Sequence, residues 1–101
     1  MDCQVRLATI GDATAISHVV ISALRESNAQ DYPPDVIARV EQGFSAQGII
    51  QLMMQRRVYV ASVEHRVVAT ASLDGDVVRS VFVDPRYQGA GIGRQLMAVI
   101  H

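Results

Sequence analysis

Three glycines at two-residue spacing form the part of the sequence whose chemistry is easiest to infer. Gly89, Gly91 and Gly93 follow a strand-like run with Asp-Pro at its end and precede a helical pattern. The N–H groups of such a loop and of the first helical turn lack intrahelical acceptors, and the helix dipole adds partial positive charge there. Glycine also removes the Cβ atoms that would hold a phosphate away from the backbone. The pattern therefore predicts a phosphate-binding site over residues 88–94.

Two other glycine-rich phosphate loops do not fit these residues. A Walker loop requires Lys-Ser or Lys-Thr after its last glycine, whereas Arg94-Gln95 follows Gly93. A dinucleotide-binding fold requires G-x-G-x-x-G after an early parallel strand, but the spacing here is G-x-G-x-G and the loop comes late in the chain. Both alternatives are excluded by sequence.

The first half of the chain contains the elements expected to lie beneath this loop. Alternation over 5–9 predicts a short strand, and Asp12 is the expected cap of an amphipathic helix over 13–27. After two prolines, apolar residues over 36–40 predict a short helix, and a serine begins a further helical segment over 45–56. We expect these helices to cover an apolar surface.

From residue 57 the apolar pattern changes to a period of two. Three strands are predicted, at 58–63, 67–73 and 77–83. Asp74-Gly75 predicts a type I′ turn, whereas the turn at 64–66 lacks glycine and is the weaker signal. A final helix should begin at residue 91 or 92. The predicted class is α/β (α+β), in the order β-α-α-β-β-β-α.

At Gln88, Gly91 and Gly93 the chain resembles the GCN5-related N-acetyltransferase (GNAT) superfamily, whose signature is Gln/Arg-x-x-Gly-x-Gly/Ala. Val-Phe-Val-Asp-Pro before the loop and Leu-Met after it also match. The resemblance covers most of the chain and is sharpest from residue 77 onward. It implies one partial acetyltransferase domain over 1–101, with a GNAT-like mixed sheet.

The resemblance also implies acetyl-CoA as acetyl donor, a small-molecule or peptidyl primary amine as acceptor, and direct attack without an acyl-enzyme. Backbone groups of Phe82 and Val83 would contact the pantetheine arm and the thioester. The pyrophosphate would lie on the amides of Gln88, Gly89, Ala90, Gly91, Ile92, Gly93 and Arg94. Arg86 is expected to be solvated, with a CoA phosphate as its alternative partner.

Acid–base residues are less clearly marked. Many GNAT members have a glutamate early in the fourth strand, where this chain has Val77, with Asp76 one residue earlier. A one-residue offset turns a strand side chain to the opposite face, so Asp76 is a poorly placed candidate base. Tyr32 is the candidate for the acceptor wall. The tyrosine that often protonates the CoA thiolate would come after His101, and no residue here is assigned that role.

Length and composition limit the class of protein to which the chain can belong. The 101 residues are half apolar and suffice for one domain, and a net charge of −1 gives no field for nucleic acid or an anionic membrane. No apolar run approaches the roughly 20 residues of a membrane span, and we expect a cytoplasmic protein. Cys3 is the only cysteine, so neither an internal disulfide nor a several-thiolate metal site is expected.

The sequence stops before the family's usual fifth strand. We therefore expect the fourth strand to be an open sheet edge, and a homo-oligomer that covers it. The alternative to an active acetyltransferase is a noncatalytic CoA-binding or oligomerising remnant of such a domain.

Overall fold

A computed structural model describes residues 2–28 and 33–100. The elements are β1 (Gln4–Leu7), the 3₁₀ turn η1 (Ile10–Asp12), α1 (Ala13–Asn28), α2 (Pro34–Gly43), α3 (Ala46–Gln55), β2 (Arg57–Val63), β3 (Arg66–Asp74), β4 (Val77–Val83), the 3₁₀ turn η2 (Pro85–Tyr87) and α4 (Ile92–Ile100). The predicted α+β class and element order are confirmed. The segment before β2 is divided into α2 and α3, and Ser45 caps α3 by accepting the Gly48 N–H at 3.2 Å.

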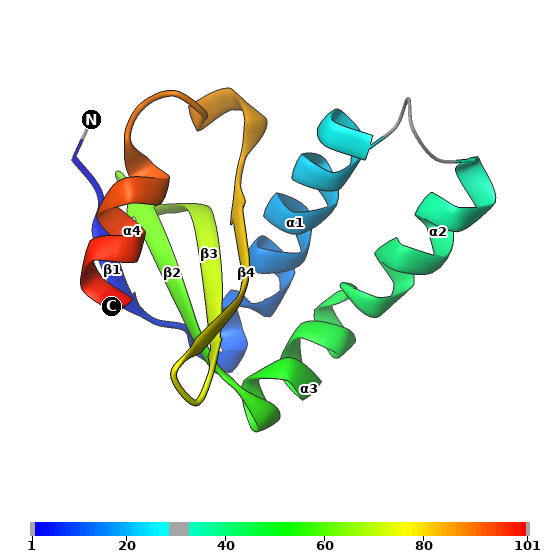
Figure 1. The fold of residues 1–101 in the computed structure, drawn as a ribbon, viewed down its shortest axis with the longest axis horizontal. Helices are drawn as coiled ribbons and strands as arrows, with labels where there is room; N and C mark the ends of the chain where they lie inside the picture. Colours follow the sequence, from blue (N-terminus) through cyan, green and yellow to red (C-terminus); the bar gives the residue numbers. More distant parts are fainter. Residues whose placement is uncertain (1, 29–32, 101) are drawn as a thin grey trace.

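The four described strands form one sheet in the order β1-β2-β3-β4. Each neighbouring pair is antiparallel, so these strands contain no parallel pair of the expected mixed sheet. Helices α1, α2 and α3 lie on one side of the sheet and α4 lies on the other (Figure 1). β4 is an edge strand of this sheet, and the glycine-rich loop runs from its end to α4.

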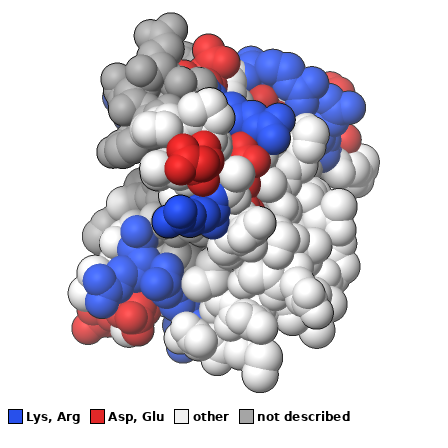
Figure 2. All heavy atoms as spheres, turned by 90° about the vertical axis from the view of Figure 1, so that its right-hand side faces the viewer, with Lys and Arg blue, Asp and Glu red and all other residues white. Residues whose placement is uncertain are grey.

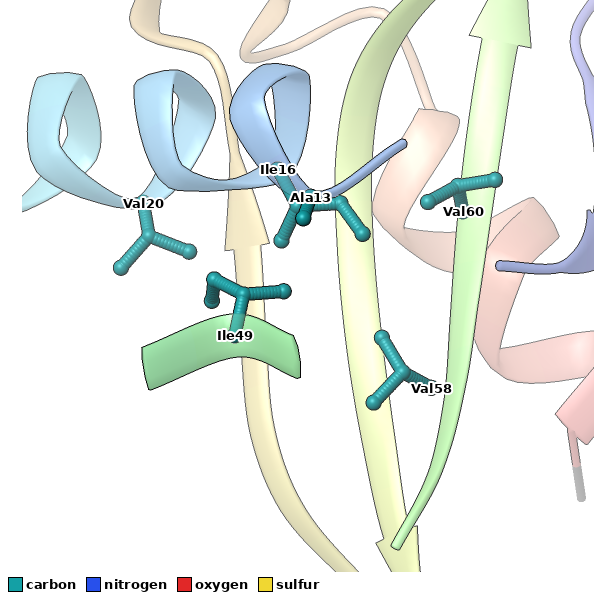
Figure 3. Close-up of a cluster of buried hydrophobic side chains, with 6 residues drawn as sticks. All are labelled: Ala13, Ile16, Val20, Ile49, Val58 and Val60. Atoms are coloured by element: carbon teal, nitrogen blue, oxygen red, sulfur yellow. The ribbon is translucent and has the colours of Figure 1, made fainter. Parts of the chain in front are cut away.

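Apolar side chains fill both interfaces between helices and sheet. On one side, α1 points its apolar side chains toward Ile49 of α3 and toward β2 (Figure 3). This cluster consists of Ala13, Ile16, Val20, Ile49, Val58 and Val60. The cluster on the other side consists of Ala61, Val68, Ala69, Ala71, Ile92 and Leu96. Small alanines on the sheet allow α4 to pack closely, which fixes the start of α4 relative to β4.

The two hairpins differ from the turns expected at them. Val63 pairs with Arg66, and the two loop residues Glu64 and His65 have φ of 51° and 67°, as a type I′ turn requires. In the β3–β4 hairpin only Gly75 has a positive φ, 61°. The type I′ prediction for Asp74-Gly75 was therefore wrong, because the loop is Gly75-Asp76 and only its first residue is left-handed, as in type II′.

Asp12 does not cap α1 as expected. Its carboxylate accepts the backbone N–H of Thr9 at 2.8 Å and two guanidinium bonds from Arg6, at 2.7 and 3.0 Å. The bidentate pair with Arg6 holds the pKa of Asp12 well below its usual range. The prediction failed because the guanidinium of β1 lies within reach, so Asp12 connects β1 to the start of α1.

The surface over α2 and α3 is partly free of charge. α3 contains no charged residue, and none of the charged residues of α2 is buried. Figure 2 shows this side, with charged side chains above and to the left and a broad uncharged area at the lower right.

All nine basic residues of the sequence are arginines. Within the described ranges, no helix is long and apolar enough to cross a membrane.

Candidate functional site

Asp84 fixes the start of the glycine-rich loop. Its backbone N–H bonds the carbonyl of Val68 in β3 at 2.8 Å, and its carboxylate is buried. That carboxylate accepts the Arg86 N–H at 2.9 Å and guanidinium bonds at 3.0 and 3.3 Å. These bonds to Arg86 lower the pKa of Asp84. Arg86, expected to be solvated or to reach a CoA phosphate, is paired with Asp84 in this structure.

The loop itself depends on glycine for its backbone conformation. Gly89 and Gly91 have φ of 82° and 79°, and a Cβ at either position would meet open space. Their conformation therefore requires glycine. At Gly93 a Cβ would lie 3.6 Å from a Val83 methyl, so this glycine sits where α4 packs on β4.

The first turn of α4 presents unbonded amides next to this loop. The first helical backbone bond runs from the Gln95 N–H to the Gly91 carbonyl at 3.1 Å. The N–H groups of Ile92, Gly93 and Arg94 precede it, as in any helix start. The first turn of α4 carries no acidic residue, so no carboxylate competes for these donors. The arrangement suits an anion.

The outer edge of β4 offers a second set of backbone groups. In β3–β4 the bond from Asp84 to Val68 marks a hydrogen-bonded pair, and two-residue alternation makes Phe82 and Thr70 the next such pair. The N–H and C=O groups of Val81 and Val83 therefore face the open edge. The Gln88 amide donates to the Val83 carbonyl at 3.4 Å, which agrees with this orientation.

Phe82 has a different position from the one expected. Its backbone pairs with β3, and its ring contacts Phe44 edge-to-face, with centroids 5.7 Å apart. Sequence reasoning named Phe82 and missed Val81, although the period-two alternation from Val83 would have identified it. The buried role of Asp84 was also missed. An Asp directly before Pro, at a strand end, was the available signal.

The remaining predicted site residues do not gather in one place. Residues Gln88–Arg94 lie together at the end of β4 that leads into α4, whereas Asp76 lies in the turn at the opposite end of β4. Val77, where the family has its glutamate, is 53% exposed. Tyr32 lies outside the described residues. Across 2–28 and 33–100, no group of three or more His, Cys, Asp or Glu side chains could hold a metal ion.

Comparisons with known proteins bear on the fold and on the family. The chain has the fold of GNAT acetyltransferases. PaiA N-acetyltransferase from Thermoplasma acidophilum, solved with coenzyme A, superposes with a TM-score of 0.87 at 14% identity, over 98% of this chain and 69% of that one. A GCN5-related N-acetyltransferase structure from Rhodopseudomonas palustris has a TM-score of 0.85 at 18% identity, over 99% of this chain and 64% of that one. A GNAT acetyltransferase from Brucella melitensis, solved with acetyl-CoA, has a TM-score of 0.68 at 19% identity, over 98% of this chain and 68% of that one.

Sequence comparison supports the same family. Residues 54–101 match the family model described as an acetyltransferase (GNAT) domain. A search of curated proteins found no significant match. The chain spans about two thirds of the length of the structures named above. The resemblance to the GNAT superfamily is thus confirmed, by the sequence of the C-terminal half and by the fold of the whole.

Proposed function

We propose that this protein is an N-acetyltransferase that moves an acetyl group from acetyl-CoA to a primary amine. One observation carries the proposal: a left-handed glycine loop and an acid-free helix start lie directly after a strand whose edge presents Val81 and Val83. The Thermoplasma and Brucella structures, which contain coenzyme A and acetyl-CoA, support this choice of donor.

In the proposed complex, different parts of the donor bind different backbone groups. The pyrophosphate binds the amides of residues 88–94, where the helix dipole and the glycine loop favour negative charge. The amides of the pantetheine arm pair with the outward N–H and C=O groups of Val81 and Val83, as an added strand would. In the proposed complex Gln88 releases the Val83 carbonyl or shares it with the arm.

The chemical step is a direct displacement at the thioester. The amine nitrogen attacks the carbonyl carbon, the C–S bond breaks, and the proton lost from the amine ends on the departing CoA thiolate. The Val81 N–H is placed to donate to the oxyanion of the tetrahedral intermediate, a contribution of roughly 3–4 kcal/mol in other enzymes. Asp76 lies roughly 17 Å along the strand from Val81, which is beyond the reach of direct transfer or of a single bridging water, so it has no part in this step.

Isothermal titration of the whole chain with acetyl-CoA tests the donor site. We expect saturable binding, and we expect Gly91→Ala to weaken it about tenfold, because alanine at a φ of 79° displaces the amides. Gly43→Ala is the matched control, since Gly43 has open space around it and no positive φ. A folded chain that does not bind acetyl-CoA, or equal effects of both variants, would contradict the assignment.

An amine screen tests the reaction itself, with release of free CoA thiol as the readout. The alternative function is a noncatalytic CoA-binding or oligomerising remnant, which Val77 at the family's glutamate position favours. Turnover of any amine eliminates that alternative, and binding without turnover across the screen supports it.

We further propose that copies of the chain associate along the exposed edge of β4 when no donor occupies it. Val77 and Val81 on this strand are 53% and 39% exposed, and an edge strand with exposed apolar side chains favours pairing with another chain. Light scattering on the titration sample, before acetyl-CoA is added, should give a mass above that of one chain. A monomer at the concentrations of the titration would contradict this part of the proposal.

A further inference from the structure

A separate pocket lies at the end of the sheet opposite the glycine-rich loop. It has a volume of about 400 Å³ and is formed by the end of α3, the start of β2 and the β3–β4 turn. Its lining residues are Met54, Gln55, Arg56, Arg57, Leu73, Gly75 and Asp76. The pocket therefore adjoins the first residues of β4, where the proposed acceptor would approach.

Arg56 and Arg57 supply the positive charge among the residues that line this pocket. Four other arginines each pair with a carboxylate, in the pairs Arg6–Asp12, Arg25–Glu41, Arg79–Asp74 and Arg86–Asp84. Within the described ranges Arg56 and Arg57 have no such partner. Asp74, in the same hairpin, is already 3.5 Å from Arg79. Asp76 is the one carboxylate that lines the pocket, so the lining carries a net charge of +1.

The backbone beneath both arginines is well held. The Arg56 N–H bonds the Leu52 carbonyl at 2.8 Å and ends α3, and Arg57 pairs with Leu73 across β2–β3. Beside them Met54 leaves 82% of its surface exposed. Guanidinium donors next to an apolar side chain suit a carboxylate on an apolar stem. The negative charge of Asp76 would repel a dianion such as phosphate more strongly than a single carboxylate.

We propose that this pocket binds the carboxylate of an extended peptide acceptor whose amine reaches the thioester at Val81. This inference rests on the proposed acetyltransferase function. The span from Asp76 to Val81 is roughly 17 Å, the length of about five extended residues. An acceptor with its amine at one end and a carboxylate at the other would thus extend from the pocket, past the β3–β4 turn, toward the acetyl group.

Penta-alanine with a free carboxylate, compared with penta-alanine amide, provides the binding test without acetyl-CoA. We expect saturable shifts of the Arg56 and Arg57 side-chain Nε–H signals in ¹⁵N spectra of the whole chain with the carboxylate form only. The double variant Arg56→Gln with Arg57→Gln should lose this binding. Arg39→Gln, an exposed arginine on α2 with no ion pair in the described ranges, is the control and should retain it. Absence of saturable shifts would overturn the proposal.

Kinetics with acetyl-CoA provide the second test. The double variant should raise the KM for penta-alanine about tenfold or more, a typical loss for a charge-assisted pair, and leave the KM for acetyl-CoA unchanged. Equal effects on penta-alanine and its amide would contradict a carboxylate site. If acetyl-CoA does not bind, the proposed function fails on its own, and the spectra still decide whether the pocket binds a carboxylate.

Discussion

Asp84 holds the start of the glycine-rich loop in place. Its N–H joins β3, and its buried carboxylate holds Arg86 two residues later. A buried charge that loses its partner is costly, whereas a buried charge with several donors contributes to stability. We expect the loop to keep its shape in the unliganded protein for this reason.

Replacing Asp84 by Asn should lower the free energy of unfolding by about 1–3 kcal/mol, because charge-assisted bonds to Arg86 are lost. It should also weaken the acid sensitivity of the chain. The pKa of Asp84 is lower in the folded state than the value of about 3.9 in the unfolded state. As the pH falls below about 3.9, the unfolded state therefore binds more protons than the folded state, and the free energy of unfolding decreases. Urea unfolding between pH 3 and 7 measures both effects. An unchanged pH profile in the variant would assign the acid sensitivity to other carboxylates.

At the scale of elements, the β2–β3 turn is held in an unfavourable conformation. Glu64 and His65 both adopt positive φ without being glycine, at 51° and 67°. An L-residue in this region costs roughly 1–2 kcal/mol, which the pairing of β2 with β3 offsets.

His65→Gly should therefore stabilise the chain, by roughly 0.5–1 kcal/mol once the extra backbone entropy of glycine in the unfolded state is included. The midpoint of urea unfolding should rise and the slope should stay constant. The same exchange at Arg66, which lies in β3, is the control and should destabilise. Stabilisation at both positions would mean that φ at residue 65 is not the cause.

Helix α2 is the element with the weakest attachment. It has no buried residue, and the exposed Arg25–Glu41 pair, at 2.6 and 3.1 Å, joins it to α1. Amides of α2 should therefore exchange with deuterium faster than those of α1, and faster still in Glu41→Gln or at high salt, which screens surface pairs. Protection of α4 should not change. Equal protection of α1 and α2 would contradict this view of the helix.

The sequence predicted the elements and the loop well because their signals are local. Glycine spacing and the strand–loop–helix order identified residues 88–94, and alternation identified all four strands. The details that depend on contacts across the fold were not predictable. Asp12 binds the guanidinium of Arg6 in β1 instead of capping α1. Which of Phe82 and Val81 faces the open edge depends on the register of β4 against β3.

At the scale of the molecule, the sheet separates two cores with different consequences for the site. Leu96 and Ile92 pack α4 onto one face, whereas Ile16 packs α1 on the opposite face. The position of the N–H groups in the first turn of α4 therefore depends on the core that contains Ile92 and Leu96.

Leu96→Ala and Ile16→Ala should each cost about 2–5 kcal/mol, because both side chains are fully buried. Only Leu96→Ala should also weaken acetyl-CoA binding beyond what its loss of folded protein explains. Titration at a temperature where both variants are folded, as verified by circular dichroism, separates the two effects. Equal affinities would show that α4 keeps its place without Leu96.

The exclusive use of arginine among the basic residues has a consequence for how the protein responds to its own donor. Acetyl-CoA modifies exposed ε-amines slowly without any enzyme, whereas a guanidinium stays protonated and is a poor nucleophile at neutral pH. None of the nine basic side chains in these 101 residues offers an ε-amine. The charged surface therefore offers no ε-amine to this modification, and acetyl groups transferred to an added amine can be counted without a background from lysine side chains.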